Sequence, residues 1–259
     1  MLKDLESKTG RILLLLFSGT PALTLWWLFT KYSGVPPFIF PSPGSVWNRF
    51  YTVLLDGSLV YHTMITLLEV VLGLLLGLIS ASLTGYFLAK SRLVERILAP
   101  YIVASQSIPT VAIAPLLVIW LGPGLLSKIL ISALIVFFPV LVNTIVGIRS
   151  VPAELYDLLR SLQATTWQRI RLLEIPAAMP VFLGGLRIGA TLAVIGAVVG
   201  EFVGSDKGLG FLINVGRGLY DTALVFVAVF TLVALAMMLY GLVVLLENKV
   251  LAWQKNNSG

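Results

Sequence analysis

Residues 63–89 read TMITLLEVVLGLLLGLISASLTGYFLA and carry one charged side chain, Glu69. The hydrocarbon core of a bilayer needs about 20 predominantly apolar residues of helix, so this stretch predicts a membrane-spanning helix. Five further stretches have similar length and composition: 12–30, 97–121, 129–148, 180–203 and 222–246. The sequence therefore predicts an all-α integral membrane protein with six transmembrane helices.

The composition excludes several classes of protein. Apolar residues make up 58% of the 259 residues and charged residues 12%, whereas soluble domains hold roughly 45–50% and about 25%. With a mean hydropathy of +0.97, a soluble enzyme could not bury its apolar side chains. The absence of cysteine and a single histidine, His62, exclude thiolate and multi-histidine metal sites. The net charge of +6 is spread among loops between apolar runs, so we expect no metal, no catalytic residue and no nucleic-acid partner.

Two segments depart from a plain apolar helix. Three prolines interrupt the third stretch and predict a broken or kinked span: Pro100, Pro109 and Pro115. Ahead of the second stretch, the sequence PSPG at 41–44 is typical of a turn into a short amphipathic helix, expected around 45–55. We interpret residues 1–61 as an N-terminal span with an external amphipathic segment, and residues 62–259 as the core of the protein.

Lysine and arginine are distributed unevenly between the two sides that six spans create. With a cytoplasmic N-terminus, twelve lie on the inner side: Lys3, Lys8, Arg11, Lys90, Arg92, Arg96, Arg149, Arg160, Arg169, Arg171, Lys249 and Lys255. Five lie on the outer side: Lys31, Arg49, Lys128, Lys207 and Arg217. Because cytoplasmic loops are enriched in these residues, we expect both termini and the 149–179 loop to be cytoplasmic, in an inner (plasma) membrane.

The connection at 150–176 predicts two short helices. Ser150 is expected to cap the first, whose apolar stripe consists of Leu155, Leu158, Leu159 and Leu162. A second helix is expected from Thr165, with Gln168 completing a capping box, and is expected to end near Pro176 and Pro180. The stripe can pack on the protein's own helices or on a partner, and the pattern leaves both alternatives open.

The same loop carries a resemblance to a known family. Asp157-Leu158-Leu159, Gln163 and Leu173-x-Ile175-Pro176 have the spacing of the EAA-x3-G-x9-I-x-L-P loop of ABC importer permeases. Further fragments resemble the sulfonate, nitrate, taurine and thiamine-precursor branch: Gln106-Ser107-Ile108-Pro109, Ala114-Pro115-Leu116, Phe138-Pro139 and Gly208-Leu209-Gly210. The likeness extends over about residues 41–247. The chain departs from the motif where Leu158-Leu159 replaces the alanine pair and Gln163 replaces the glycine.

The resemblance implies a type I permease with a cytoplasmic coupling-helix loop at 150–176, between spans four and five. In such importers two permease copies form the pathway, here expected as a homodimer. Each loop enters a groove on one of two separate ATPase subunits, and an external binding protein delivers the solute. The residues that the resemblance places at the ATPase contact are Glu154, Leu155, Asp157, Leu158, Leu159, Arg160, Leu162, Gln163, Ala164 and Trp167. No G-x-x-x-x-G-K-[ST] phosphate loop occurs. We therefore expect no enzyme activity and no cofactor in this chain, with ATP and Mg used by the partner ATPase.

Polar residues within the spans need separate interpretation, because an ionised group in hydrocarbon costs roughly 2.5–3.5 kcal/mol. Gln106, Asn143 and Glu201 are candidates for the translocation pathway. The alternatives are interhelical hydrogen bonds for the first two and a cap on the following short helix for Glu201. Glu69 is interpreted as a structural carboxylate paired with Arg187 or with a loop.

Small residues recur on two spans, at Gly73, Gly77, Ala81 and Gly85, and at Gly185, Gly189, Gly196 and Gly200. Such faces allow close approach of helices. We interpret them as internal packing, with a subunit interface as the alternative.

Two other functions deserve comparison. An ion-coupled secondary transporter would need a chain of buried acids or discontinuous helices in repeated halves. An intramembrane hydrolase using Asp157 and Asp221 is excluded by the predicted topology, which puts these residues on opposite sides.

For the solute, the run 108–120 resembles permeases for thiamine-pyrimidine or other vitamin-like compounds, with sulfonate or nitrate as alternatives.

Overall fold

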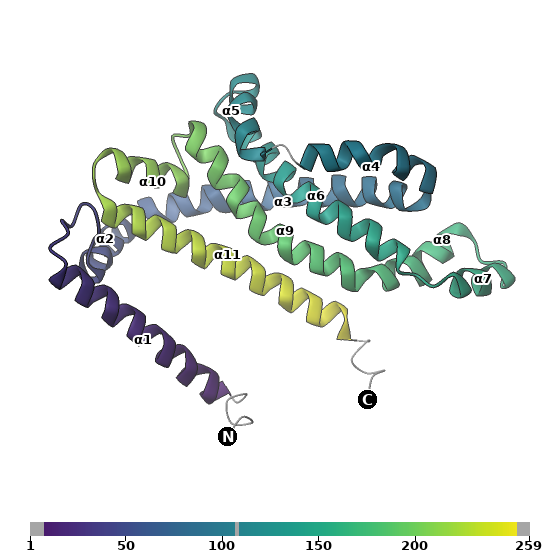
Figure 1. Cartoon of the computed structure of the whole chain (residues 1–259), viewed down its shortest axis with the longest axis horizontal. Coiled ribbons are helices and arrows are strands. Elements are labelled where there is room, and N and C mark those ends of the chain that lie inside the picture. Colours follow the sequence, from purple (N-terminus) through teal and green to yellow (C-terminus); the bar gives the residue numbers. More distant parts are fainter. Residues whose placement is uncertain (1–7, 107–108, 253–259) are drawn as a thin grey trace. The chain divides into compact units, whose positions relative to one another are not determined.

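The structure is a computed structural model that describes residues 8–106 and 109–252, and within these ranges it contains helices and no strand (Figure 1). Among the described residues, four helical stretches are long and apolar enough to cross a membrane: α3 (Ser58–Lys90), α6 (Leu125–Arg149), the continuous stretch Thr166–Gly204, and α11 (Thr222–Val250). They cover the second, fourth, fifth and sixth predicted spans. The all-α membrane fold is therefore confirmed.

The first and third predicted spans have a different outcome. Helix α1 (Lys8–Tyr32) covers the first predicted span, but it is not among the four stretches given above. The third is divided into α4 (Arg92–Gln106) and α5 (Thr110–Leu121), with Pro109 in extended backbone just before α5. The predicted break is confirmed. At 15 and 12 residues, neither piece reaches the roughly 20 residues that a straight span needs, and the count of six spans stays a prediction.

The chain forms two compact units, one from residues 1–61 and 212–230, the other from residues 62–211 and 231–259. The first unit contains α1 and α2 (Pro43–Leu55), most of α10 (Leu209–Gly218) and the start of α11. Helix α2 confirms the predicted amphipathic helix. It begins at Pro43, which has no N–H to satisfy, and Ser42 Oγ accepts a hydrogen bond from the Ser45 N–H at 3.2 Å. The predicted division of the chain into 1–61 and 62–259 stays a prediction.

An aromatic cluster connects separate segments of this first unit. The ring of Trp26 stacks on Phe226 at 5.5 Å between centroids and tilts against Phe40 and Phe230. Its indole Nε1–H donates to the carbonyl of Pro41 at 3.0 Å. Aromatic pairs of this kind contribute about 0.5–1.5 kcal/mol beyond the area they bury, so the cluster joins segments that are distant in sequence.

In the second unit, α6 packs against α3 and against α9 (Ile175–Gly204), and both neighbours present glycines to it. A Cβ at Gly77 would lie 2.8 Å from the Ala133 carbonyl oxygen, and one at Gly185 would lie 2.7 Å from the Asn143 Cβ. Real Cβ atoms essentially never come within 3.0 Å of such atoms. The small-residue faces of these two helices therefore pack within the subunit, which confirms the interpretation as internal packing.

Candidate functional site

The residue that caps the first helix of the loop differs from the predicted one. Ser150 does not cap the next helix, because its backbone is still helical and its N–H donates to the Val146 carbonyl at 2.9 Å. An N-cap needs extended backbone, and here Pro152 has it, directly before α7 (Ala153–Ser161). The prediction that Ser150 caps this helix is therefore wrong by two residues. Glu154 lies in the first turn of α7, as expected.

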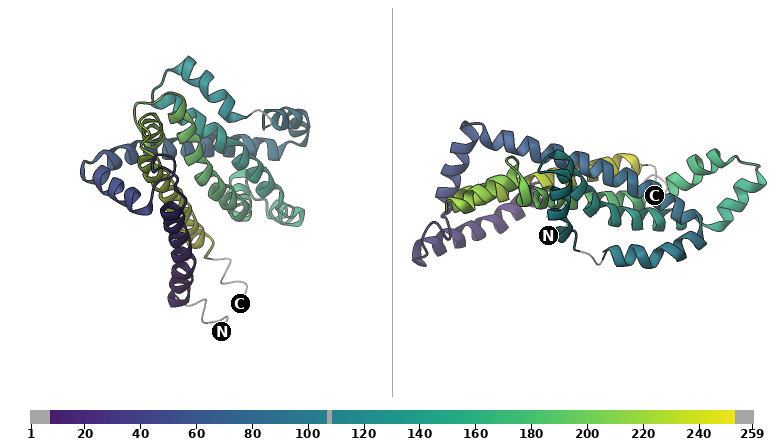
Figure 2. Two further views of the ribbon diagram at one scale, coloured as in Figure 1. Left: turned by 60° about the vertical axis from the view of Figure 1, so that its left-hand side comes forward. Right: turned by 90° about the horizontal axis from the view of Figure 1, so that it is seen from above.

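The leucine stripe of α7 is largely exposed. Leu158 and Leu162 expose 55% and 68% of their surface, Leu155 is also exposed, and Leu159 is half-buried. Trp167, on the next helix, exposes 66%. α7 and α8 (Thr166–Arg169) project from the end of the second unit (Figure 2). Exposed apolar side chains gathered in this way make the end of the loop a candidate interaction surface.

The turn after α7 has a defined geometry. Gln163 has a φ of +53°, its N–H donates to the Arg160 carbonyl at 3.0 Å, and the Ala164 N–H donates to the Leu159 carbonyl at 2.9 Å. These two bonds form the Schellman motif, in which the left-handed residue is usually glycine. Gln163 occupies the position where the family motif has glycine, so the positive φ explains that preference.

The second helix of the loop starts as predicted but does not end as predicted. Thr165 Oγ1 accepts from the Gln168 N–H at 3.3 Å, and Gln168 Oε1 accepts from the Thr165 N–H at 2.8 Å, which confirms the capping box. The chain then continues through a π-helical turn, η2 (Ile170–Glu174), directly into α9. Pro176 stands in the first turn of α9, where a missing N–H is tolerated, so the predicted end near Pro176 and Pro180 is wrong.

Glu174 is a site residue that the sequence analysis missed. It is buried in the π-helical turn, accepts from Tyr86 Oη at 3.1 Å, and pairs with Lys90. Burial, and then the charge of Glu174, raise the pKa of Tyr156 on α7. No local pattern distinguishes Glu174, because its partners Tyr86 and Lys90 lie 88 and 84 positions away in the sequence. Through these contacts Glu174 connects the start of α9 with the end of α3.

The polar side of the loop forms a cavity of about 540 Å³ between α7 and α8. It is lined by Tyr156, Asp157, Arg160, Gln163, Ala164 and Arg169. Four of these belong to the set expected at the ATPase contact. Apolar and charged expected residues thus lie on one projecting loop.

At the other end of α9, Glu201 is fully buried among hydrogen-bond donors. Its carboxylate accepts from Thr66 Oγ1 at 2.6 Å and from the Gly210 N–H. Thr66 Oγ1 accepts from the Leu209 N–H at 2.8 Å, and His62 Nδ1 accepts from the Gly208 N–H at 3.0 Å. The first N–H groups of α10 are therefore satisfied by side chains, and the predicted alternative that Glu201 caps this helix is confirmed.

Two charged groups lie next to Glu201. Glu69 and Lys128 are buried, with 3.4 Å between Lys128 Nζ and Glu69 Oε1. Lys128 Nζ also donates to Ser205 Oγ at 2.5 Å. We call His62, Thr66, Glu69, Lys128, Glu201 and the 208–210 backbone the Glu201 cluster. Glu69 is a paired structural carboxylate, as predicted.

The partner predicted for Glu69 needs correction in one respect. Arg187 does not pair with it, but with Glu247 on α11, and lies over the Tyr240 ring at 5.6 Å from its centroid. Arg187 and Glu69 both lie in spans. Arg187 pairs with Glu247 on α11, and Glu69 pairs with Lys128 on α6.

The remaining pathway candidates are placed as follows. Asn143 is half-buried, and its Nδ2 donates to the Pro139 carbonyl of its own helix at 2.8 Å. Gln106 ends α4, and its side chain lies outside the described residues, as do Ser107 and Ile108. A pathway role for Gln106, Asn143 and Glu201 stays a prediction.

Known proteins similar to this chain are transport permeases. A riboflavin transport system permease protein of Chloroflexus aurantiacus is 49% identical, over 90% of this chain and 87% of its own length. A formylaminopyrimidine transport permease protein of Halalkalibacterium halodurans is 36% identical, over 90% and 92%. A taurine transport system permease protein of Escherichia coli is 31% identical, over 82% and 80%. Nothing in these relatives favours the ion-coupled alternative.

A solved structure shares the fold. An inward-facing methionine ABC transporter chain matches 76% of this chain and 97% of its own length, with a TM-score of 0.66 and 19% identity. Residues 73–252 match the family described as "Binding-protein-dependent transport system inner membrane component". The chain therefore belongs to this family of multi-pass membrane proteins and is the permease subunit of an ABC importer.

Proposed function

We propose that the 150–176 loop docks into a groove on a separate ATPase, which binds and hydrolyses ATP with Mg and moves this subunit. The exposed leucine stripe of α7 carries the proposal, because the subunit's own helices leave Leu155, Leu158 and Leu162 uncovered. The cavity beside the stripe supplies Asp157 and Arg160 for polar contacts. Docking would bury the apolar side chains, and the cap at Thr165 and the turn at Gln163 hold the two helices in place for it.

Leu158→Asp tests the docking surface. Because Leu158 is exposed in the subunit, the variant should insert and dimerise normally. The aspartate would then have to be buried unpaired against the ATPase, which costs several kcal/mol. We expect the ATPase to be lost on co-purification and uptake to stop. Leu219→Asp, at an exposed leucine between α10 and α11, is the matched control. A Leu158→Asp complex that keeps its ATPase and transports normally would contradict the proposal.

We infer that two copies of the chain form the pathway, with both termini and the 149–179 loop in the cytoplasm and an external binding protein delivering the solute. The uneven lysine and arginine distribution supports this orientation. The natural absence of cysteine makes labelling unambiguous. Ser161→Cys should react with an impermeant maleimide only in inside-out vesicles, and Asp206→Cys only from the outside of cells. The reverse pattern would overturn the orientation.

We further propose that the solute is a vitamin or vitamin precursor of the flavin or pyrimidine class. The support is the 49% and 36% identity to permeases named for riboflavin and formylaminopyrimidine, against 31% for the taurine permease. The test is to reconstitute the permease with its ATPase and its binding protein, and to measure uptake of labelled riboflavin and formylaminopyrimidine. We expect uptake of one of them that excess taurine does not inhibit. Uptake of taurine alone would assign the chain to the sulfonate class.

A further inference from the structure

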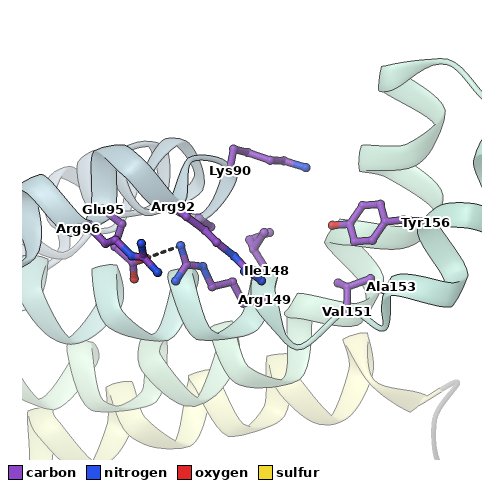
Figure 3. Close-up of a pocket in the computed structure, with 10 residues that line it drawn as sticks. Lys90, Arg92, Glu95, Arg96, Ile148, Arg149, Val151, Ala153 and Tyr156 are labelled. Atoms are coloured by element: carbon purple, nitrogen blue, oxygen red, sulfur yellow. Dashed lines mark ion pairs between the residues drawn. The ribbon is translucent and has the colours of Figure 1, made fainter.

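A basic cavity lies where α3, α4 and α6 meet, and it shares Tyr156 with the polar cavity of the loop. It holds about 560 Å³ and is lined by four cationic side chains: Lys90, Arg92, Arg96 and Arg149 (Figure 3). Ala153 and Tyr156 of α7 close one side. Glu95 is the single carboxylate among the lining residues that the structure describes. Cavities of about this size hold small ligands in many proteins.

The positive charge in this cavity exceeds the negative charge. Arg149 Nη2 lies 2.5 Å from Glu95 Oε2, and Lys90 pairs with the buried Glu174. Within residues 8–106 and 109–252, Arg92 and Arg96 have no ion-pair partner. Two unpaired guanidinium groups beside two paired cations create a field that attracts an anion, and guanidinium groups bind phosphate oxygens well.

The position of the cavity distinguishes a lipid from a soluble anion. Lys90 and Arg149 end two helices of membrane-spanning length, so the cavity lies at the level of the lipid headgroups. Next to it, α4 exposes large apolar side chains, which are Leu93, Ile97 and Tyr101. A soluble phosphate would use only the cations, whereas a phospholipid would also cover the apolar side chains with its acyl chains.

We propose that this cavity binds the headgroup of an anionic phospholipid. Arg92 and Arg96 hold the phosphate, and the acyl chains lie against the apolar side chains of α4. Because Tyr156 belongs to α7, the bound lipid joins the ends of α4 and α6 to the 150–176 loop. With the orientation given under the proposed function, this headgroup belongs to the cytoplasmic leaflet. That choice of leaflet rests on the proposed function, but the binding site itself does not.

Native mass spectrometry of the full-length chain in neutral detergent tests the site, with phosphatidylglycerol and phosphatidylcholine as probes. We expect the chain to retain phosphatidylglycerol in preference to phosphatidylcholine. Arg92→Gln/Arg96→Gln should weaken phosphatidylglycerol binding about thirtyfold, which corresponds to about 1 kcal/mol for each arginine. Arg92→Lys/Arg96→Lys should retain most of it. Lys249→Gln, at an exposed cation in the last turn of α11, is the matched control and should change nothing.

Glu95→Gln gives an effect in the opposite direction, which misfolding cannot imitate. It removes the negative charge from the cavity and should strengthen phosphatidylglycerol binding. Equal retention of phosphatidylcholine, or unchanged binding in Arg92→Gln/Arg96→Gln, would overturn the proposal. Displacement of the lipid by millimolar inorganic phosphate would instead assign the cavity to a soluble anion. If Arg92→Gln/Arg96→Gln loses the co-purifying ATPase but binds phosphatidylglycerol as the natural chain does, the cavity would be assigned to a protein partner.

Discussion

The 150–176 loop and the Glu201 cluster both hold helix ends in place, but with contacts of very different range. In the loop, the bonds at Gln163 and Thr165 join residues at most five positions apart. In the cluster, His62 and Thr66 accept from backbone N–H groups that are 146 and 143 positions away. The loop leaves apolar side chains exposed, whereas the cluster buries charged ones.

This difference separates docking from stability. Local bonds allow α7 and α8 to keep their shape on the surface, where a partner can reach the leucine stripe. Long-range bonds to buried carboxylates connect α3, α6, α9 and α10, so that disturbing one of them disturbs the packing of the whole unit. Substitutions in the cluster should therefore lower the stability of the subunit, and those in the loop should change local order and assembly.

The largest effect is expected from Lys128→Met. This change leaves Glu69 and Glu201 buried without a cation, and breaking a buried ion pair by removing one partner typically costs about 3–5 kcal/mol. We expect a large fall in Tm in detergent, measured by scanning fluorimetry. Lys207→Met, at a partly exposed lysine nearby, should have little effect. Recovery in Lys128→Met/Glu69→Gln would show that charge is the cause, and an unchanged Tm in the single variant would remove the cluster's role in stability.

A smaller fall in Tm is expected from Gly208→Ala. Gly208 has a φ of +100°, and an added Cβ would collide with the Glu201 carboxylate. Backbone strain of this kind costs of order 1–3 kcal/mol, and the displaced carboxylate would also lose its bond to the Gly210 N–H. Gly218→Ala is the control, because a Cβ there meets open space. Equal Tm values for the two variants would contradict the close approach at Gly208.

These two regions also differ in how far the sequence predicts them. The capping box at Thr165 and the leucine stripe were predicted because their residues lie within two turns of each other. The pairing of Glu69 with Lys128 was not, because many helices could bring a distant cation to it. Two predictions from local patterns were wrong. Ser150 caps the C-terminal end of α6 and not the start of α7, and Pro176 lies in the first turn of α9, which continues directly from a π-helical turn.

Within the loop, Thr165→Val should weaken the start of α8 without changing the Tm of the subunit. The valine keeps the branched shape but cannot accept from the Gln168 N–H, and loss of such a cap costs about 1 kcal/mol. We expect faster hydrogen exchange in peptides covering 165–170 and weaker retention of the ATPase. Thr165→Ser keeps the hydroxyl and should resemble the natural chain. A fall in Tm as large as that of Gly208→Ala would remove the distinction between the two regions.

The smallest effect, and the only stabilising one, is expected from Gln163→Gly. At a φ of +53° an L-residue costs about 1–2 kcal/mol relative to the right-handed region. Glycine relieves this, but the unfolded chain then gains roughly 0.5–1 kcal/mol of conformational entropy, so the net gain is about 0.5 kcal/mol. Hydrogen exchange at the Gln163 and Ala164 positions should slow slightly, because the two bonds of the Schellman motif become more favourable. Asparagine tolerates this backbone better than most residues, so Gln163→Asn should fall between glycine and the natural chain. Gln163→Ala keeps the Cβ and should show no gain.

Because Gln163 also lines the polar cavity, ATPase retention distinguishes the two roles of its side chain. If the glycine variant exchanges more slowly and keeps the ATPase, the glutamine contributes little to docking. Faster exchange in the glycine variant would mean that the glutamine side chain, and not the turn, holds the two helices together.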